Sequence, residues 1–209
     1  MKITDIEVEY IGHYGTDLTV VNAARVSFGK TSDFIKAKDV QLIRYLATHK
    51  HFSPFNHSFL SVRVKAPIFV ARQLVKHKFL PWNEVSRRYV DEEPEFFMPP
   101  VWRKRAENVK QGSSDETVQC CIASDIENSL QLYKDMLEHG ICPEQARMVL
   151  PQNMMTEWIW SGTLGAFCDM LRLRLDPHTQ YESRIVANKI KDIITPLFPV
   201  SVAALLEIK

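Results

Sequence analysis

The fold is organised by residues 58–78, which read SFLSVRVKAPIFVARQLVKHK. Within them, residues 58–66 alternate between apolar and polar side chains. The apolar positions, which share one face, are Leu60, Val62, Val64 and Ala66. The polar positions on the opposite face are Ser61, Arg63 and Lys65. Because successive side chains of a strand point to opposite sides, this alternation predicts a strand with one buried and one wet face.

A helix should follow this strand directly. Pro67 can occupy the first helical position, where the missing N–H of proline is not needed. The expected buried stripe of the helix consists of Ile68, Ala71, Leu74 and Val75. The helix would deliver Arg72, Gln73 and Lys76 into the polar segment that comes next.

That next segment, residues 76–89, reads KHKFLPWNEVSRRY. Pro81 lacks an N–H and disfavours helical geometry before it, so we expect a helix end that runs into an irregular loop. Lysine supplies point charge and arginine a planar fork, and both bind phosphate or carbonyl oxygens. The segment therefore indicates an anion-binding loop. The alternative is an ordinary solvated loop with scattered ion pairs.

Length and composition narrow the class of protein. The 209 residues suit one domain, and 45% apolar and 24% charged residues are ordinary for a globular chain. A net charge of +1 gives no global attraction to nucleic acid or to an anionic membrane. Residues 1–12 lack a signal-peptide pattern, and uncharged runs such as 158–168 are shorter than the roughly 18 residues of a membrane span. We expect a cytoplasmic protein without nucleic-acid or membrane partners.

Neither cysteine nor histidine spacing predicts a metal site. The cysteines, Cys120, Cys121, Cys142 and Cys168, form no Cys-x-x-Cys pair and no zinc-type cluster with histidine. Reduced thiols are expected, and Cys120 and Cys121 fall in a helical pattern that would bury them in part. Three histidines lie within residues 49–57, but no i, i+4 pair with a nearby carboxylate supports a metal there. We expect no metal.

The remaining N-terminal elements follow from hydrophobic period and capping residues. Residues 2–11 alternate as a strand with one slip in register. Asp17 is a candidate cap for a helix that ends near Val26. Asp39 is a candidate cap for a second helix, which runs into residues 49–57.

The second half of the chain is mostly helical by the same criteria. Residues 91–100 should form a connector with a short extended piece, and residues 107–116 a flexible surface loop. Residues 113–116 have capping-box spacing and should start the longest helix, which Gly140 would end. The elements expected afterwards are a short helix from Pro143 to Val149, a strand at 154–160, and helices at 163–178 and 178–195.

Residues 76–89 resemble the signature of the flavin-dependent thymidylate synthases, the ThyX family. That signature is Arg-His-Arg, seven residues and then Ser, with Asn-Glu-x-Ser-x-Arg-Tyr overlapping its end. The matching residues are His77, Asn83, Glu84, Ser86, Arg88 and Tyr89. Lys76 and Lys78 stand where the family has arginine, and they keep the charge but lose bidentate geometry.

Two neighbouring segments resemble the same family. Residues 51–57 are similar to its His-x-Thr-Pro-Phe-x-His element, which lies against the flavin; Ser53 replaces Thr and Asn56 replaces the usual Glu. Residues 66–73 look like the family segment in which the position of Gln73 touches the nucleotide.

Two further blocks carry arginines. Residues 146–153 resemble a family motif whose arginine, Arg147 here, contacts the nucleotide; a structural ion pair is the alternative. Residues 171–180 resemble a block whose arginine, Arg174 here, binds the uracil ring. Arg174 sits on the border of an apolar helical face, where a guanidinium needs a partner or a ligand. The alternative is an interfacial arginine paired with Asp176.

The resemblance implies a fold and a reaction. The fold would be α/β of the α+β type, a mainly antiparallel sheet flanked by helices, as a single domain over residues 1–209. The reaction would be reductive C5 methylation of dUMP to dTMP, with 5,10-methylenetetrahydrofolate as carbon donor. NADPH would reduce FAD, which would give the hydride. The family is a homotetramer with flavin sites shared between subunits.

The resemblance also implies site residues. The dUMP site would comprise Gln73, Lys76, Glu84, Val85, Ser86, Arg87, Arg88, Arg147 and Arg174. The FAD site would comprise His51, Ser53, Lys76, His77, Lys78, Asn83, Glu84, Thr163, Gly165 and Asp169. Thr163, Gly165 and Asp169 depart from some members, which have Asn, Arg and Asn there. Arg174 would be the catalytic residue, because a cation beside the uracil ring favours its ionised form.

Two alternative functions stay open. One is a related flavin-dependent C5 methylase or hydroxymethylase of another pyrimidine nucleotide, because the lysines and the departures at Thr163 and Gly165 leave room for altered specificity. The other is a non-catalytic flavin- or nucleotide-binding module. Loss of Glu84 or Arg174 would favour that module, and both residues are present.

Overall fold

A computed structural model describes residues 1–90, 92–107 and 112–207. Its centre is an antiparallel sheet in the order β2-β3-β8-β4. These strands are β2 (Glu7–Tyr14), β3 (Phe59–Pro67), β8 (Met155–Thr163) and β4 (Trp82–Glu84). The predicted apolar face of β3 is at most 1% exposed, and the alternate positions stay more open. The predicted strand and the mainly antiparallel α/β fold are therefore confirmed.

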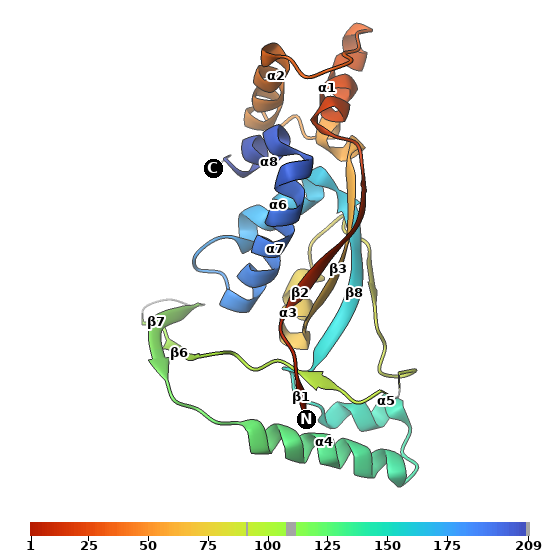
Figure 1. Ribbon diagram of the computed structural model, residues 1–209, viewed down its shortest axis with the longest axis vertical. Helices are drawn as coiled ribbons and strands as arrows, with labels where there is room; N and C mark the ends of the chain where they lie inside the picture. The colour runs from red at the N-terminus through yellow and green to blue at the C-terminus, as the bar shows by residue number, and fades with distance from the viewer. Residues whose placement is uncertain (91, 108–111, 208–209) are drawn as a thin grey trace.

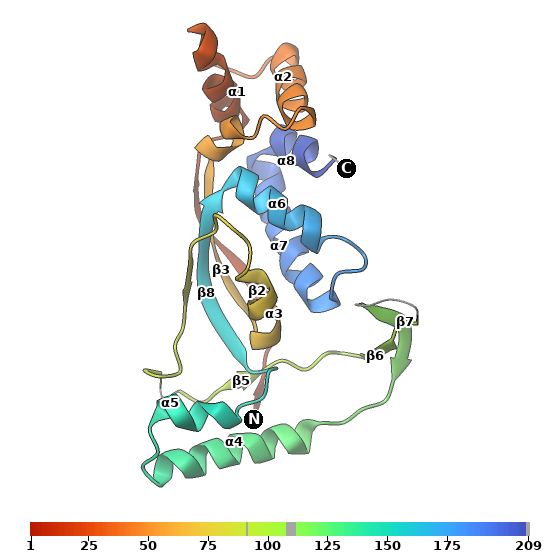
Figure 2. The same ribbon diagram turned by 180° about the vertical axis from the view of Figure 1, so that it is seen from behind.

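Helices cover one face of this sheet and both of its ends (Figure 1 and Figure 2). The face carries α3 (Ile68–Leu74), α6 (Leu164–Arg174) and α7 (Tyr181–Leu197). One end carries α1 (Asp17–Arg25), α2 (Ala37–Thr48) and α8 (Pro199–Leu206). The other end carries α4 (Ala123–Glu138) and α5 (Pro143–Ala146). Short 3-10 turns are η1 (Val26–Phe28), η2 (Ser53–His57) and η3 (Arg147–Val149).

Two small strand pairings lie outside the main sheet. Strand β1 (Lys2–Ile3) pairs in parallel with β5 (Glu95–Phe96). Strands β6 (Trp102–Arg105) and β7 (Ser113–Val118) pair antiparallel as a hairpin. Figure 1 and Figure 2 show this hairpin standing apart from the sheet, beside the N-terminal end of α7.

The apolar core lies between the sheet and its helices. Trp158 and Trp160 of β8 are 1% and 0% exposed, and Trp160 packs against both Trp158 and Phe167 of α6. Burying one large apolar side chain stabilises the fold by about 1.5–3 kcal/mol, so this face holds β8 firmly in place. A second, smaller apolar cluster docks α4 and α5; it comprises Phe96, Ile126, Leu130, Tyr133, Ala146 and Met154.

The strand expected at residues 2–11 is in fact two strands. Lys2 and Ile3 pair with β5, whereas β2 pairs with β3 and continues to Tyr14. The expected slip in register is a bulge between Tyr10 and Gly12.

Asp17 was expected to cap its own helix, and this is wrong. Thr16 caps α1, since its side-chain oxygen accepts from the N–H of Leu18 at 3.2 Å. Asp17 is buried, and its carboxylate oxygens accept from the N–H groups of Val200 and Ser201, each at 2.9 Å. The carboxylate therefore caps α8, because free N–H groups at a helix start are the donors that a buried carboxylate needs.

Two more caps are shifted. Helix α2 begins at Ala37, and Asp39 lies in its first turn, where it accepts the N–H of Lys36 at 2.9 Å. Pro67 is the N-cap of α3 and still belongs to β3, so the helix starts one residue later than expected. Val75 is 47% exposed and not part of the buried stripe, because α3 ends at Leu74.

The largest departure from prediction precedes α4. Residues 113–116 start β7 instead of a helix, because they pair with β6 and the Ser113 hydroxyl accepts from Arg103 Nε at 2.8 Å. The hydroxyl is thus not available as a helix cap. Of the surface loop expected at 107–116, residues 108–111 lie outside the described residues.

Helix α4 consequently starts only at Ala123. Cys120 and Cys121, which were expected to be partly core, are exposed and precede the helix. Gly140 does follow the helix with φ +81°, as predicted for a C-terminal stop. With 16 residues, α4 is shorter than α7, which has 17.

The C-terminal third agrees better with prediction. The short helix from Pro143 is α5 continued by η3. The strand expected at 154–160 is β8, which continues to Thr163 and thus shortens the next helix to α6. The final helix, expected at 178–195, is α7, and α8 after it was not predicted.

Candidate active site

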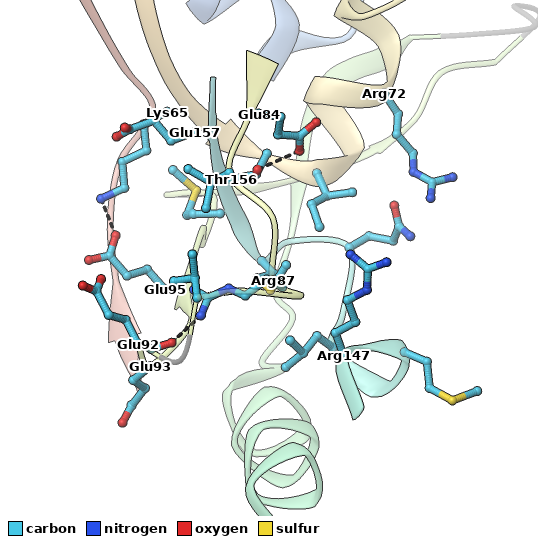
Figure 3. A pocket seen from close by; sticks show the side chains of 18 of the residues that line it. Lys65, Arg72, Glu84, Arg87, Glu92, Glu93, Glu95, Arg147, Thr156 and Glu157 are labelled. Atoms are coloured by element: carbon cyan, nitrogen blue, oxygen red, sulfur yellow. Dashed lines mark hydrogen bonds and ion pairs between the residues drawn. The ribbon is translucent and has the colours of Figure 1, made fainter. Parts of the chain in front are cut away.

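A cavity of about 720 Å³, called here the first cavity, lies beside β4 and β8 (Figure 3). The predicted residues that line it are Glu84, Val85, Arg87 and Arg147. Glu84, at the end of β4, is held by two donors. The Thr156 hydroxyl lies 2.7 Å from one of its carboxylate oxygens, and the Trp82 indole nitrogen lies 3.0 Å from the other. The sheet itself thus fixes this carboxylate, in a segment that was expected to be irregular.

The arginines of the first cavity are held more loosely. Arg87 donates to the backbone carbonyl of Glu92, and Arg147 Nε lies 3.4 Å from the backbone oxygen of Glu144. Figure 3 shows Arg72 and Arg147 extending into the same side of the cavity. None of the ion pairs in the described part of the chain involves Arg147, so the ion-pair alternative has no support there.

Arg72 also lines a second cavity, of about 640 Å³, which lies between α3, the end of α6 and the β6–β7 hairpin. The predicted residues in this second cavity are Gln73, Lys76 and Arg174. Helix α3 therefore carries a cation, Arg72, that lines both cavities and joins two groups of predicted nucleotide contacts.

Arg174 is held at two points in the second cavity. Its Nε donates to Nε2 of His77 at 2.9 Å, and a terminal nitrogen donates to the backbone oxygen of Gln73 at 3.2 Å. Burial lowers the pKa of Arg174, yet a guanidinium stays charged at neutral pH. Asp176, the alternative partner, instead accepts from the backbone N–H of His178 at 2.7 Å. Arg174 is thus a fixed cation that lines the cavity.

The contact with Arg174 requires a neutral His77. Burial, and then the charge of Arg174, lower the pKa of His77 to about 4, against the opposing charge of Asp169. The ring is therefore neutral at pH 7. Because Nε2 accepts from Arg174, the ring proton must lie on Nδ1.

The flavin candidates at the start of α6 form a separate group. The Thr163 hydroxyl accepts from the N–H of Ala166 at 3.1 Å and donates to the Asn56 side-chain oxygen at 2.8 Å. A Cβ on Gly165 would lie 2.5 Å from that same oxygen. Asn56 and Gly165, two of the departures from the family, therefore lie next to each other, and neither carries a charge.

The other predicted site residues line neither cavity. Exposed ones are His51, Ser53, Lys78, Asn83, Arg88 and Asp169. Ser86 is half-buried, and its hydroxyl accepts from Arg88 Nε at 3.1 Å. Within the described chain, then, the structure gathers seven of the nine predicted dUMP residues into two groups and spreads the predicted FAD residues over three segments.

The chemistry of these side chains suits a dinucleotide flavin. In the described part of the chain neither Lys76 nor Lys78 forms an ion pair, so both charges are available to a pyrophosphate. Ser53 is exposed and offers a hydroxyl to the polar groups of a flavin, and the half-buried Thr163 hydroxyl keeps one acceptor lone pair. The residues present thus fit FAD.

Sequence reasoning missed part of the second cavity. Its other polar side chains include Arg72, Arg103, Gln180 and Glu182. Arg72 and Gln180 lie inside segments that resemble the family, and this position could have marked them as candidate site residues. Arg103 gave none, because the hairpin that carries it was not predicted.

Among the described residues, no group of three or more His, Cys, Asp or Glu side chains could hold a metal ion. No helix built from those residues combines the length and the apolarity that a membrane crossing needs.

Comparison with known sequences gives a consistent result. Residues 9–200 match a protein family described as thymidylate synthase complementing protein. A flavin-dependent thymidylate synthase from Thermus thermophilus is 38% identical over 201 residues, which cover 94% of this chain and 74% of that protein. Another, from Thermosipho africanus, is 40% identical over 202 residues, which cover 92% of this chain and 87% of that protein.

Solved structures are similar as well. The UMP/dUMP methylase PolB from Streptomyces cacaoi, bound with 5-Br dUMP, has a TM-score of 0.88 and 28% sequence identity. The alignment covers 100% of this chain and 98% of that one. The same enzyme bound with 5-Br UMP has a TM-score of 0.82 and 30% identity, with 98% and 95% covered.

Proposed function

The chain belongs to the family of flavin-dependent thymidylate synthases, and on that premise we propose that it methylates dUMP at C5 to give dTMP. The observation that carries the proposal is the position of Arg174, a half-buried cation held on neutral His77 and on the backbone oxygen of Gln73. A uracil ring becomes electron-rich at C5 when negative charge on its carbonyl and N3 edge is stabilised. A fixed guanidinium beside that edge would supply this stabilisation without reorganising.

We assign the phosphate to the cations of the first cavity. Arg87 and Arg147 line it, and the hydrogen-bonded Ser86 and Arg88 flank Arg87 in the sequence. Guanidinium groups bind phosphate oxygens in pairs, and a serine hydroxyl adds a further donor. Gln73 of α3, and Lys76 just after that helix, would complete the nucleotide site.

FAD would be held by the lysine pair Lys76 and Lys78 together with His77, and by the group around Thr163. Its chemistry when bound is hydride transfer, which belongs to the flavin itself. The protein positions the nucleotide and stabilises its charge. We propose NADPH as the reductant and 5,10-methylenetetrahydrofolate as the carbon donor. We place the enzyme in the cytoplasm, where its free cysteines would stay reduced.

We also propose that residues 1–209 form one domain of a homotetramer whose sites are shared between subunits. The support is the division of the predicted dUMP residues between two cavities of one chain. Mixing an Arg147→Ala variant with an Arg174→Ala variant tests this. If each site takes one arginine from each of two subunits, mixed oligomers regain part of the activity. If both arginines come from one chain, mixing restores nothing.

The spectrum of the purified protein tests the function most directly. We expect oxidised flavin that bleaches with NADPH in the absence of oxygen, and dTMP formation once dUMP and methylenetetrahydrofolate are added. A colourless protein that neither binds FAD nor oxidises NADPH contradicts the proposal. Bound flavin without turnover would favour the non-catalytic module.

A second nucleotide is the specific alternative. The similar solved structures are of a methylase that acts on UMP as well as dUMP, and Lys76 and Lys78 replace arginines of the family signature. Exchange of the C5 hydrogen should therefore be compared for dUMP, UMP and dCMP. Faster exchange with UMP or dCMP than with dUMP would reassign the substrate.

A further inference from the structure

A buried ion pair ties the β6–β7 hairpin to the start of α7. A terminal nitrogen of Arg103 lies 2.6 Å from Oε1 of Glu182, whose side chain is only 6% exposed. The guanidinium also stacks on the ring of Tyr181, 4.5 Å from its centroid, and donates from Nε to Ser113 at 2.8 Å. Removing Arg103 would leave the buried Glu182 carboxylate without its charged partner, and an uncompensated buried charge is costly because water cannot replace that partner.

From Glu182 a chain of side-chain hydrogen bonds runs to Gln73. Gln180 Nε2 donates to Oε2 of Glu182 at 3.1 Å. Gln180 Oε1 in turn accepts from Nε2 of Gln73, and Gln73 Oε1 accepts from the Ser183 hydroxyl at 3.2 Å. Gln73, Gln180, Glu182 and Arg103 all line the second cavity.

The Glu182 carboxylate sets the donor-to-acceptor direction of this series of hydrogen bonds. An ionised carboxylate only accepts, so Gln180 must present its NH₂ to Glu182 and its carbonyl to Gln73. Gln73 must then present its NH₂ to Gln180 and its carbonyl to Ser183. A carboxamide has opposite chemistry at its two ends, so its orientation decides which donor and which acceptor remain for a ligand.

We propose that Arg103 and Glu182 are positioning residues that fix the orientation of the Gln73 carboxamide in the nucleotide site. The β6–β7 hairpin thereby acts on nucleotide binding through the hydrogen bonds that run from Glu182 to Gln73. This inference rests on the proposed function, in which Gln73 contacts dUMP.

Glu182→Gln is the most informative variant. Its carboxamide oxygen still accepts from Arg103, but its NH₂ then faces the NH₂ of Gln180. The carboxamides of Gln180 and Gln73 must both rotate by half a turn to restore hydrogen bonds. The Ser183 hydroxyl can then accept from the NH₂ of the rotated Gln73. The fold therefore stays satisfied while Gln73 shows the wrong end to the ligand.

The experiment measures the dissociation constant of dUMP by calorimetry on the FAD-loaded full-length protein. We expect Glu182→Gln and Arg103→Ala to weaken binding about tenfold, the loss of one well-made polar contact. Arg103→Lys should restore part of the affinity. Lys104→Ala is the matched control, since it breaks the exposed pair with Glu116 in the same hairpin, and its affinity should equal the wild type.

A second background separates positioning from general stability. In a Gln73→Ala protein, the Arg103→Ala and Glu182→Gln changes should have no additional effect on dUMP affinity, because the group they orient is gone. A persisting effect would overturn the proposal, as would wild-type affinity in both single variants whose thermal unfolding shows them folded. If the wild type itself does not bind dUMP, the proposed function fails instead, and the two failures are distinct.

Discussion

The two cavities differ in how their arginines are held before any ligand arrives. In the second cavity Arg174 is half-buried and bonded to a ring nitrogen and to a backbone oxygen. In the first, Arg147 is exposed and reaches the backbone oxygen of Glu144 only at 3.4 Å. A transition-state charge is best stabilised by groups that need not reorganise, whereas a phosphate can gather adaptable side chains around itself. The difference suggests that the fixed cavity serves chemistry and the adaptable one serves binding.

Removing the fixed cation should have the largest effect. We expect Arg174→Ala to lower turnover at saturating dUMP by about 10²–10³-fold, the usual loss when a group that stabilises developing charge is removed. FAD binding and reduction by NADPH should persist. Single-turnover product formation from pre-reduced enzyme measures this, with Arg44→Ala, an exposed arginine of α2, as the control. If Arg174→Ala turned over at nearly the wild-type rate, the assignment of chemistry to the second cavity and of binding to the first would be wrong.

The two signature lysines extend the comparison to the flavin. Because both are exposed and without ion pairs in the described chain, their charges should be used by a ligand. Replacing Lys76 or Lys78 by Ala should weaken FAD binding by about 1.5–3 kcal/mol, the range for a charge-assisted hydrogen bond. Replacement by Arg should keep or tighten binding. Flavin fluorescence titration gives the affinities, and unchanged values in both Ala variants would make the lysines plain surface residues.

Ser86, which lies between the cavity-lining Val85 and Arg87 in the sequence, tests the assignment of the phosphate to this region. Its near neighbours Val85, Arg87 and Arg88 include no base, so a nucleophile role lacks the activation that a serine hydroxyl requires. As a donor to phosphate, its loss in Ser86→Ala should weaken dUMP binding by about 1–3 kcal/mol. Product formation should remain measurable at saturating dUMP. A Ser86→Ala protein that binds dUMP normally but makes no product would reverse the roles of Ser86 and Arg174.

His77 sharpens the comparison through pH. The pKa of His77 is about 4 in the folded protein, compared with the ordinary value of 6.5. Between these two pH values the unfolded chain therefore binds one proton more than the folded protein does. The free energy of unfolding should therefore fall as pH drops from about 6.5 towards 4. Above about pH 6.5 the contribution of His77 to stability is complete. His77→Gln keeps an acceptor for Arg174 but should remove this component. Urea unfolding at pH 7 and pH 5 compares the two, with His139→Gln, at an exposed histidine, as control.

The cysteines should have the smallest effect of all. Burial raises the pKa of Cys168, so its thiol stays protonated, and Cys120, Cys121 and Cys142 line neither cavity. A thiolate nucleophile needs cationic surroundings that lower its pKa. Replacing all four by Ser or Ala should leave dTMP formation substantially intact, with some loss of thermal stability. A folded, FAD-loaded variant without product would place a cysteine in the chemistry after all.

Patterns of burial were readable from the sequence, because they repeat with the geometry of the backbone. The alternation in residues 58–66 predicted β3 since one face of a strand meets the core. The anion-binding loop was also found, because its polar residues are adjacent in the chain. What remained hidden depends on partners distant in sequence. Nothing near Asp17 reveals that its carboxylate would cap α8.

The same limit applies to the site. Gln73 and Arg174 were each found within a motif, yet their contact with one another arises because α3 and α6 both pack against α7. Residues 113–116 carry a helix-capping pattern but form a strand that pairs with β6. Strand pairing is favoured over a helix start because it satisfies backbone groups along the whole segment. Motif reading located the residues and could not sort them between two cavities.

The Asp17 carboxylate links residues that are 183 and 184 positions apart in sequence. During synthesis Asp17 leaves the ribosome long before Val200 and Ser201. The Asp17 carboxylate can therefore gain these two hydrogen bonds only after α8 has been made. A contact of such long range makes closure of the α1–α2–α8 end a late step in folding. Until then this end exposes apolar side chains that a chaperone could hold, and shortening the chain before residue 200 would leave it open permanently.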